Sequence, residues 1–205
     1  GQVFLFLGRT GGQGQGWYAT GNNIIPGRNQ TILGNETDNG DPIYTSALGD
    51  VNADGFVDFS VGFPNYQGNG TGQGSVFVFF GKTSASAFPN TLSTAAGVPN
   101  LTFNGSDSTS GLSFAGSLDD INNDTVKDFF LSDPYRTTAG LVGAGQVHIV
   151  FGATNLGPNT IGLFPDVYVN ISINSTDNRA NQYLGRNYPF GANVNNDTVR
   201  DIVLP

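Results

Sequence analysis

Short loops rich in Asp and Asn are the part of this chain best suited to chemistry. They read DVNADGFVD from Asp50, DINNDTVKD from Asp120 and NVNNDTVRD from Asn193. Alternate residues of a tight loop can direct oxygen atoms at one centre, and calcium accepts six to eight oxygen ligands in flexible geometry. Magnesium demands a stricter octahedron. The pattern therefore predicts three calcium sites.

Each loop offers four side-chain ligands and one main-chain carbonyl. In the first loop, residues 50–58, these are Asp50, Asn52, Asp54, the carbonyl of Phe56, and Asp58. In the second loop, residues 120–128, they are Asp120, Asn122, Asp124, the carbonyl of Val126, and Asp128. In the third loop, residues 193–201, they are Asn193, Asn195, Asp197, the carbonyl of Val199, and Asp201. The expected role is structural, because a catalytic metal needs an open position and a nearby base.

The alternative interpretation is a set of Asx turns without metal. Eight of the sixteen acidic residues fall in these three loops. Carboxylates held that close repel one another unless a cation lies between them. This clustering favours the metal over the plain turns.

The loops belong to an internal repeat. Their first positions are 50, 120 and 193, so successive copies follow at nearly equal intervals along the chain. A second motif keeps the same register: GQVFLFLG from Gly1, GSVFVFFG from Gly74 and GQVHIVFG from Gly145. Period-2 alternation and Gly or Pro boundaries predict four short strands per repeat and no helix. The fold class is therefore all-β, with four-stranded antiparallel β-propeller blades.

The two motifs together resemble the FG-GAP repeat of integrin α-subunit-type propellers. The resemblance implies a structural calcium loop between the first and second strands of each blade. The chain then holds about three blades' worth of a larger propeller. Residues 1–42 form the second half of one blade, 43–111 and 112–182 form whole blades, and 183–205 form the first half of a further blade.

Composition favours an extracellular protein. The net charge is −8 and the eight basic residues are scattered, which argues against nucleic acid and anionic membranes as partners. Nine Asn residues begin N-x-[S/T] acceptor sequences, and the best glycosylation candidates are Asn35, Asn69 and Asn104, expected outside strand interiors. No apolar run is long enough to span a membrane, so the segment should not insert into one.

No catalytic constellation is visible, so we expect a non-enzymatic structural or adhesive module with protein or glycan partners. The only histidine, His148, lies in a strand whose alternation predicts partial exposure. The alternative is an accessory propeller of a secreted hydrolase. The half-blades at the two ends are complementary, because residues 1–42 supply the second half of a blade and residues 183–205 the first half. They predict either a longer polypeptide or head-to-tail assembly of copies, which could form a filament.

Overall fold

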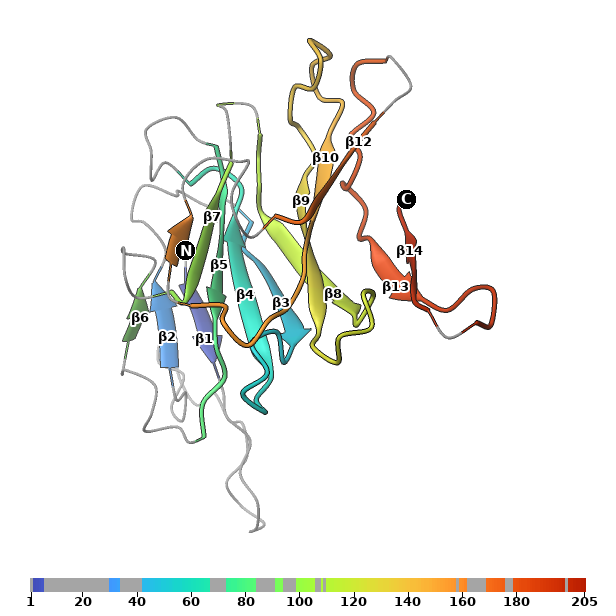
Figure 1. Ribbon diagram of the computed structural model, residues 1–205. Coiled ribbons are helices and arrows are strands. Elements are labelled where there is room, and N and C mark those ends of the chain that lie inside the picture. Colours follow the sequence, from blue (N-terminus) through green and yellow to red (C-terminus); the bar gives the residue numbers. More distant parts are fainter. Residues whose placement is uncertain are drawn as a thin grey trace, which may run out of the picture.

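The computed structural model describes residues 2–5, 30–33, 42–66, 73–83, 91–93, 99–105, 108, 110–157, 159–161, 169–175, 179–197 and 199–205. These residues form strands and connecting loops without a helix, as Figure 1 shows. No helix that could cross a membrane occurs in them. The predicted all-β class is confirmed.

Two antiparallel four-stranded units follow one another along the chain. The first contains β3 (Tyr44–Gly49), β4 (Asp58–Phe63), β5 (Ser75–Phe79) and β7 (Leu101–Asn104). The second contains β8 (Phe114–Asp119), β9 (Asp128–Asp133), β10 (Gln146–Val150) and β12 (Ile171–Asn174). Their strands pair in sequence order, as in the blades that the sequence predicts.

Two shorter sheets flank these units. The hairpin of β1 (Gln2–Leu5) and β2 (Gln30–Leu33) is antiparallel, and so is that of β13 (Phe190–Ala192) and β14 (Asp201–Val203). The four sheets lie side by side in Figure 1, with the first strands β3, β8 and β13 next to one another. This succession is the arrangement of propeller blades about an axis.

Two of the sheets gain a further strand from the next repeat, which the sequence did not predict. β11 (Asn159–Ile161) runs parallel to β7, the outer strand of the preceding unit. β6 (Thr91–Ser93) runs parallel to β2 in the same way. The first whole unit therefore lies in a five-stranded sheet, and the last strand comes from the neighbouring repeat. The extra strand covers a sheet edge that would otherwise be open.

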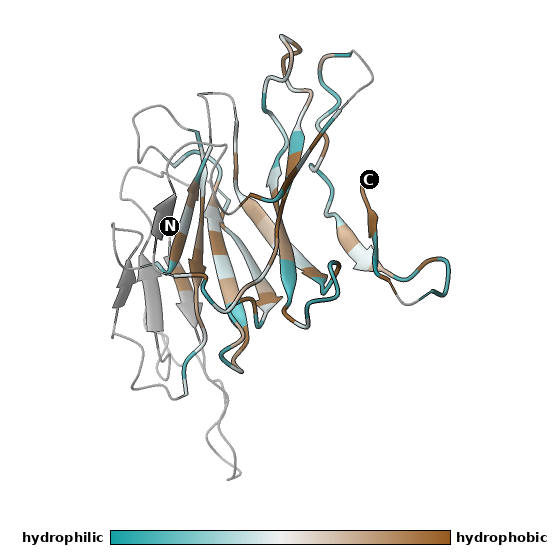
Figure 2. Ribbon diagram, viewed as in Figure 1, coloured by the Kyte–Doolittle hydropathy of each residue, from teal (hydrophilic) through white to brown (hydrophobic). Residues whose placement is uncertain are grey.

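The hydrophobic core lies between successive sheets. Val78 and Leu101 of the first unit pack in one cluster with Phe129 and Leu131 of the second. Most central-strand residues are buried on both faces, because each sheet has a neighbour on either side. In Figure 2 brown, hydrophobic stretches run along the strands of both units, and teal is found mainly in loops and at strand ends.

Three equivalent positions of this packing are aromatic in the first unit and polar in the second. In the first unit Phe63, Tyr66 and Phe77 touch one another, with ring centroids 5.0 to 6.4 Å apart. The same repeat positions in the second unit hold Asp133, Arg136 and His148. An aromatic cluster is thus replaced by a polar one.

His148 is buried, with 1% of its surface exposed, so the prediction of partial exposure is wrong. Strand alternation marks an exposed face only where one side of the sheet meets solvent, and here both sides are covered. The ring Nδ1 lies 2.9 Å from Ser172 Oγ. Burial, and after it the charge of Arg136, lower the pKa of His148 from 6.5 to about 3.

Replacing His148 by Phe, the residue at this position in the other repeats, should reduce acid sensitivity. The unfolded chain binds a proton at this histidine below about pH 6.5, whereas the folded chain does not until about pH 3. Stability present above pH 6.5 is therefore lost as the pH falls, by up to about 1.4 kcal/mol per pH unit. Urea unfolding between pH 7 and 4 measures this. The free energy of unfolding should fall less steeply in His148→Phe than in the parent, and parallel curves would contradict the assignment.

Candidate metal loops

The loop between β3 and β4 is folded by its own Asp and Asn side chains. Asp50 accepts hydrogen bonds from the N–H groups of Asp54 (3.0 Å) and Gly55 (2.8 Å). Asp54 Oδ1 accepts the N–H of Phe56 at 2.9 Å. The side-chain amide of Asn52 donates to Asp54 Oδ2 at 2.9 Å. The predicted ligands Asp50, Asn52 and Asp54 are therefore brought together in one turn.

The second loop repeats this network position by position. Asp120 accepts the N–H groups of Asp124 (3.0 Å) and Thr125 (2.8 Å), and Asp124 accepts that of Val126 (2.9 Å). Asn122 donates to Asp124 Oδ2 at 2.9 Å. The loops of two successive repeats thus have the same geometry.

The third loop keeps part of the network. Asn195 donates to Asp197 Oδ2 at 2.8 Å, and Asp197 accepts the N–H of Val199 at 2.7 Å. Asn193, which stands in place of the first Asp, donates its amide to the main-chain carbonyl of Asp197. An amide donor thus replaces a carboxylate acceptor at the first position.

The last Asp of each whole loop joins the loop to the third strand of its unit. Asp58 is fully buried and accepts two N–H groups, from Val51 (2.9 Å) and from Gly81 (2.8 Å). Asp128 does the same with Ile121 (2.8 Å) and Gly152 (2.9 Å). Each carboxylate therefore connects the start of the loop with the second residue after the third strand.

Burial makes these two carboxylates costly to charge. Desolvation raises the pKa of Asp58 from 3.8 to about 6, against the two N–H groups, which lower it. The negative charges of Asp54 and Asp50 raise it further. Burial likewise raises the pKa of Asp128, and its hydrogen bonds with Gly152 and Ile121 oppose the rise.

The glycine that closes the GSVFVFFG and GQVHIVFG motifs is required for steric reasons. A Cβ on Gly81 would lie 2.5 Å from the Cβ of Phe56, and one on Gly152 would lie 2.2 Å from the carbonyl oxygen of Lys127. Only glycine lets the third strand approach the loop closely enough for its N–H to reach the buried Asp.

Neighbouring loops also contact one another. The N–H of Lys127 donates to the carbonyl of Asp50 at 3.2 Å, which connects the second loop to the first. Asp119, beside the second loop, pairs with Lys127 at 2.7 Å and with Arg200 of the third loop at 3.0 Å. The three loops therefore form a connected row at one end of the sheets.

The donor set fits a hard cation in kind, because every predicted ligand is an oxygen. Within the described residues, none of the loop carboxylates forms an ion pair with Lys or Arg. The same residues contain no group of three or more Asp, Glu, His or Cys side chains arranged to hold a metal by themselves. An ion would therefore also need the Asn and main-chain oxygens of the loop.

Of the three predicted glycosylation sites, the structure describes only Asn104. Asn104 lies in β7, is 8% exposed, and its Oδ1 accepts the hydroxyl of Ser75 at 2.6 Å. Asn104 is thus the last residue of a buried strand, and its glycosylation stays a prediction. Asn35 and Asn69 lie outside the described residues.

Two further sequon asparagines have a structural role that sequence reasoning missed. Asn100 Oδ1 accepts the N–H of Phe80 at 2.8 Å, and Asn170 Oδ1 accepts the N–H of Phe151 at 2.7 Å. Both hold the residue that follows the third strand. Asn100 and Asn170 are as far apart in the sequence as the first residues of the first two loops. This shared repeat interval was the sequence signal that could have identified their structural role.

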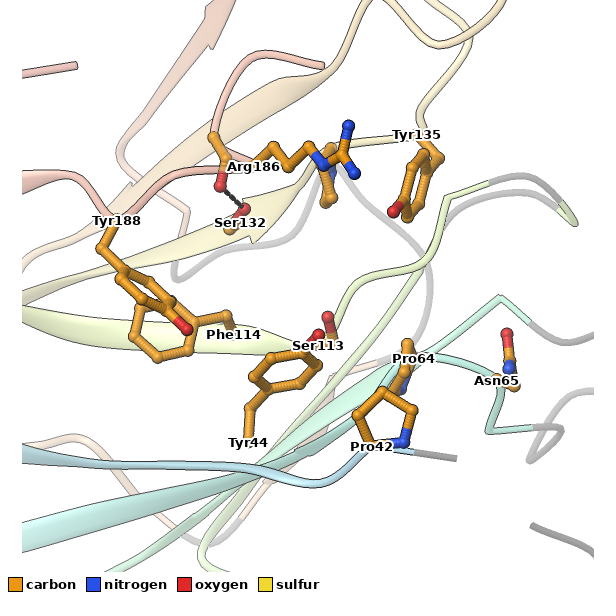
Figure 3. A pocket seen from close by; sticks show the side chains of 12 residues that line it. Pro42, Tyr44, Pro64, Asn65, Ser113, Phe114, Ser132, Tyr135, Arg186 and Tyr188 are labelled. Carbon is orange, nitrogen blue, oxygen red and sulfur yellow. Dashed lines mark hydrogen bonds between the residues drawn. The ribbon is translucent and has the colours of Figure 1, made fainter. Parts of the chain in front are cut away.

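A pocket of about 400 Å³ opens at the opposite end of the sheets from the loops (Figure 3). β3 begins at Tyr44 beside the pocket and ends before the first loop, whereas β4 begins at that loop and ends before Pro64. Phe114 and Tyr135 of the second unit and Arg186 and Tyr188 of the following one complete much of the lining. Sequence reasoning did not identify it, because its residues come from three separate repeats.

Replacing Thr125 by Gly should stabilise the protein by about 1 kcal/mol. Thr125 has a φ of 75°, a left-handed conformation that costs roughly 1–3 kcal/mol outside glycine. The first loop has Gly55 at this position with a φ of 89°, and a Cβ there would meet nothing within 4 Å. The reverse change Gly55→Thr should therefore destabilise through the backbone alone. Urea unfolding of both variants measures this, and two shifts of the same sign would contradict the strain.

Comparison with known proteins agrees with this geometry over one repeat. The family model described as FG-GAP repeat matches residues 43–79, which span β3, the first loop, β4 and β5. No curated protein matches the chain. Residues 43–79 are therefore an FG-GAP repeat, set in an all-β chain of propeller-type blades.

Proposed function

We propose that this chain is a calcium-stabilised β-propeller segment that serves an extracellular protein as a structural, adhesive or protein-binding module. The observation that carries the proposal is the repeated loop network. The first two loops place the same oxygen atoms in the same hydrogen bonds, and the third keeps part of them. Such repetition is expected of a site with one common ligand.

Charge supports calcium at these loops. Three carboxylates belong to each of the first two loops, and the described residues supply them with no Lys or Arg partner. A divalent cation bound by Asp50, Asn52, Asp54 and Asp58 would offset this repulsion. It would supply structural cross-linking, while the chain's own N–H groups hold Asp58 and Asp128 in place.

The surroundings support an extracellular role. Calcium modules with weak, oxygen-rich sites suit the calcium levels outside cells. The nine glycosylation acceptor sequences agree with such a location. The only histidine is buried beside Ser172, so it is poorly placed to exchange protons with a substrate, which favours a binding role over an enzymatic one.

Calcium should raise the melting temperature by preferential binding to the folded state. At a calcium concentration 100-fold above the dissociation constant, one site adds about 2.7 kcal/mol. Asp124→Ala should reduce the calcium-dependent shift, measured by scanning calorimetry with calcium and with chelator. Asp119→Asn is the matched control, because Asp119 lies one residue outside the loop and faces Lys127 and Arg200.

Magnesium provides a second control and should give a smaller shift than calcium. The proposal is wrong if calcium leaves the melting temperature of the parent protein unchanged. Equal loss of the calcium shift in Asp124→Ala and Asp119→Asn would place the ion outside the loop.

A further inference from the structure

We infer that the pocket at the loop-free end of the sheets binds a peptide segment in which a carboxylate side chain neighbours an aromatic one. The inference deepens the proposed protein-binding function by naming the site and the chemistry of the partner. The pocket lies about 15–20 Å from the metal loops, the length of a six-residue strand. The two sites can therefore be tested separately.

Aromatic rings from three successive units form one wall of the pocket. The rings of Tyr44 and Phe114 meet edge to face with centroids 6.2 Å apart, and those of Phe114 and Tyr188 are 4.2 Å apart. Figure 3 shows these rings side by side, with Tyr135 and Arg186 across the opening. Tyr188 is 57% exposed and Tyr135 43%, so ring surface remains available to a ligand. Such surfaces recognise aromatic and proline side chains.

Among the described residues of the lining, Arg186 is the single charged one. Among the described residues it pairs with no carboxylate. Its guanidinium lies over the ring of Tyr183 at 5.4 Å, and that ring packs edgewise against Tyr135 at 5.5 Å. A cation in a site without acidic side chains favours an anionic group, and the guanidinium fork matches a carboxylate.

The backbone that carries Arg186 is fixed to the neighbouring unit. Ser132, which is 2% exposed, donates its hydroxyl to the carbonyl of Gly185. The N–H of Arg186 also donates to the carbonyl of Tyr183 at 2.9 Å. The main chain at Arg186 is therefore held in place before a ligand arrives, which lowers part of the entropy cost of binding.

The lining favours a peptide over a sugar. Seven of its twelve residues carry rings, four aromatic and three proline. The described lining residues include no carboxylate, the strongest kind of side-chain acceptor for sugar hydroxyl groups. Its volume of about 400 Å³ lies within the usual range of ligand pockets and accommodates two or three side chains.

The test uses the purified protein and capped tetrapeptides that contain Phe-Asp or Asp-Phe between glycines. Binding is measured by NMR titration at low salt. At least one acidic peptide should bind, and its Phe-Asn or Asn-Phe counterpart should bind about tenfold more weakly, because a charge-assisted pair is lost. Arg186→Gln should lower the affinity for the acidic peptide by a similar factor. Arg179→Gln, the same change at an exposed arginine outside the pocket, should leave that affinity unchanged.

Tyr188→Phe keeps the ring and should retain binding, whereas Tyr188→Ala should weaken it. Failure of all four peptides to bind at millimolar concentration would overturn the inference, as would equal binding to parent and Arg186→Gln. Tighter binding of a uronic acid disaccharide than of either acidic peptide would also overturn it, by making the site one for glycans. A calcium-dependent melting shift in the same sample would leave the proposed metal function standing in each of these cases.

Discussion

A buried carboxylate at the ninth loop position holds each blade together. Asp58 and Asp128 have no exposed surface, and each accepts one N–H from its own loop and one from the second residue after the third strand. An ionised group in such a place is tolerated only when its hydrogen bonds are satisfied. The loop and the third strand must therefore form together, which explains why the Asp loop and the glycine-bounded strand recur in one register.

Hydrogen bonds, ion pairs and parallel strands connect successive blades. The second loop bonds to the first through Lys127, and Asp119 pairs with residues of the second and third loops. The parallel strands β6 and β11 extend from one repeat into the sheet of the preceding one. The repeats are thus interlocked at the loop end and at the outer edge. The pocket opens at the opposite end of the sheets, where the first strands begin.

Much of the fold could be predicted from the sequence because its signals are local. Alternation between glycines marked β5 and β10, and the repeated Asp pattern marked the turn before β4 and β9. The short strands β6 and β11 carry no such signal, since their partners belong to the preceding repeat. His148 was misjudged because alternation does not reveal that a strand is covered on both faces. The pocket depends on residues from three repeats, which local patterns do not bring together.

Hydrogen exchange of the Gly81 and Gly152 amides tests the central claim most directly. Both N–H groups donate to buried carboxylates although they lie outside the strands. The account predicts that they exchange as slowly as the amides within β5 and β10, because they open only when the blade does. Exchange as fast as that of the exposed turn residue Gly140 would contradict it, by showing that the carboxylates do not hold the loop to the third strand.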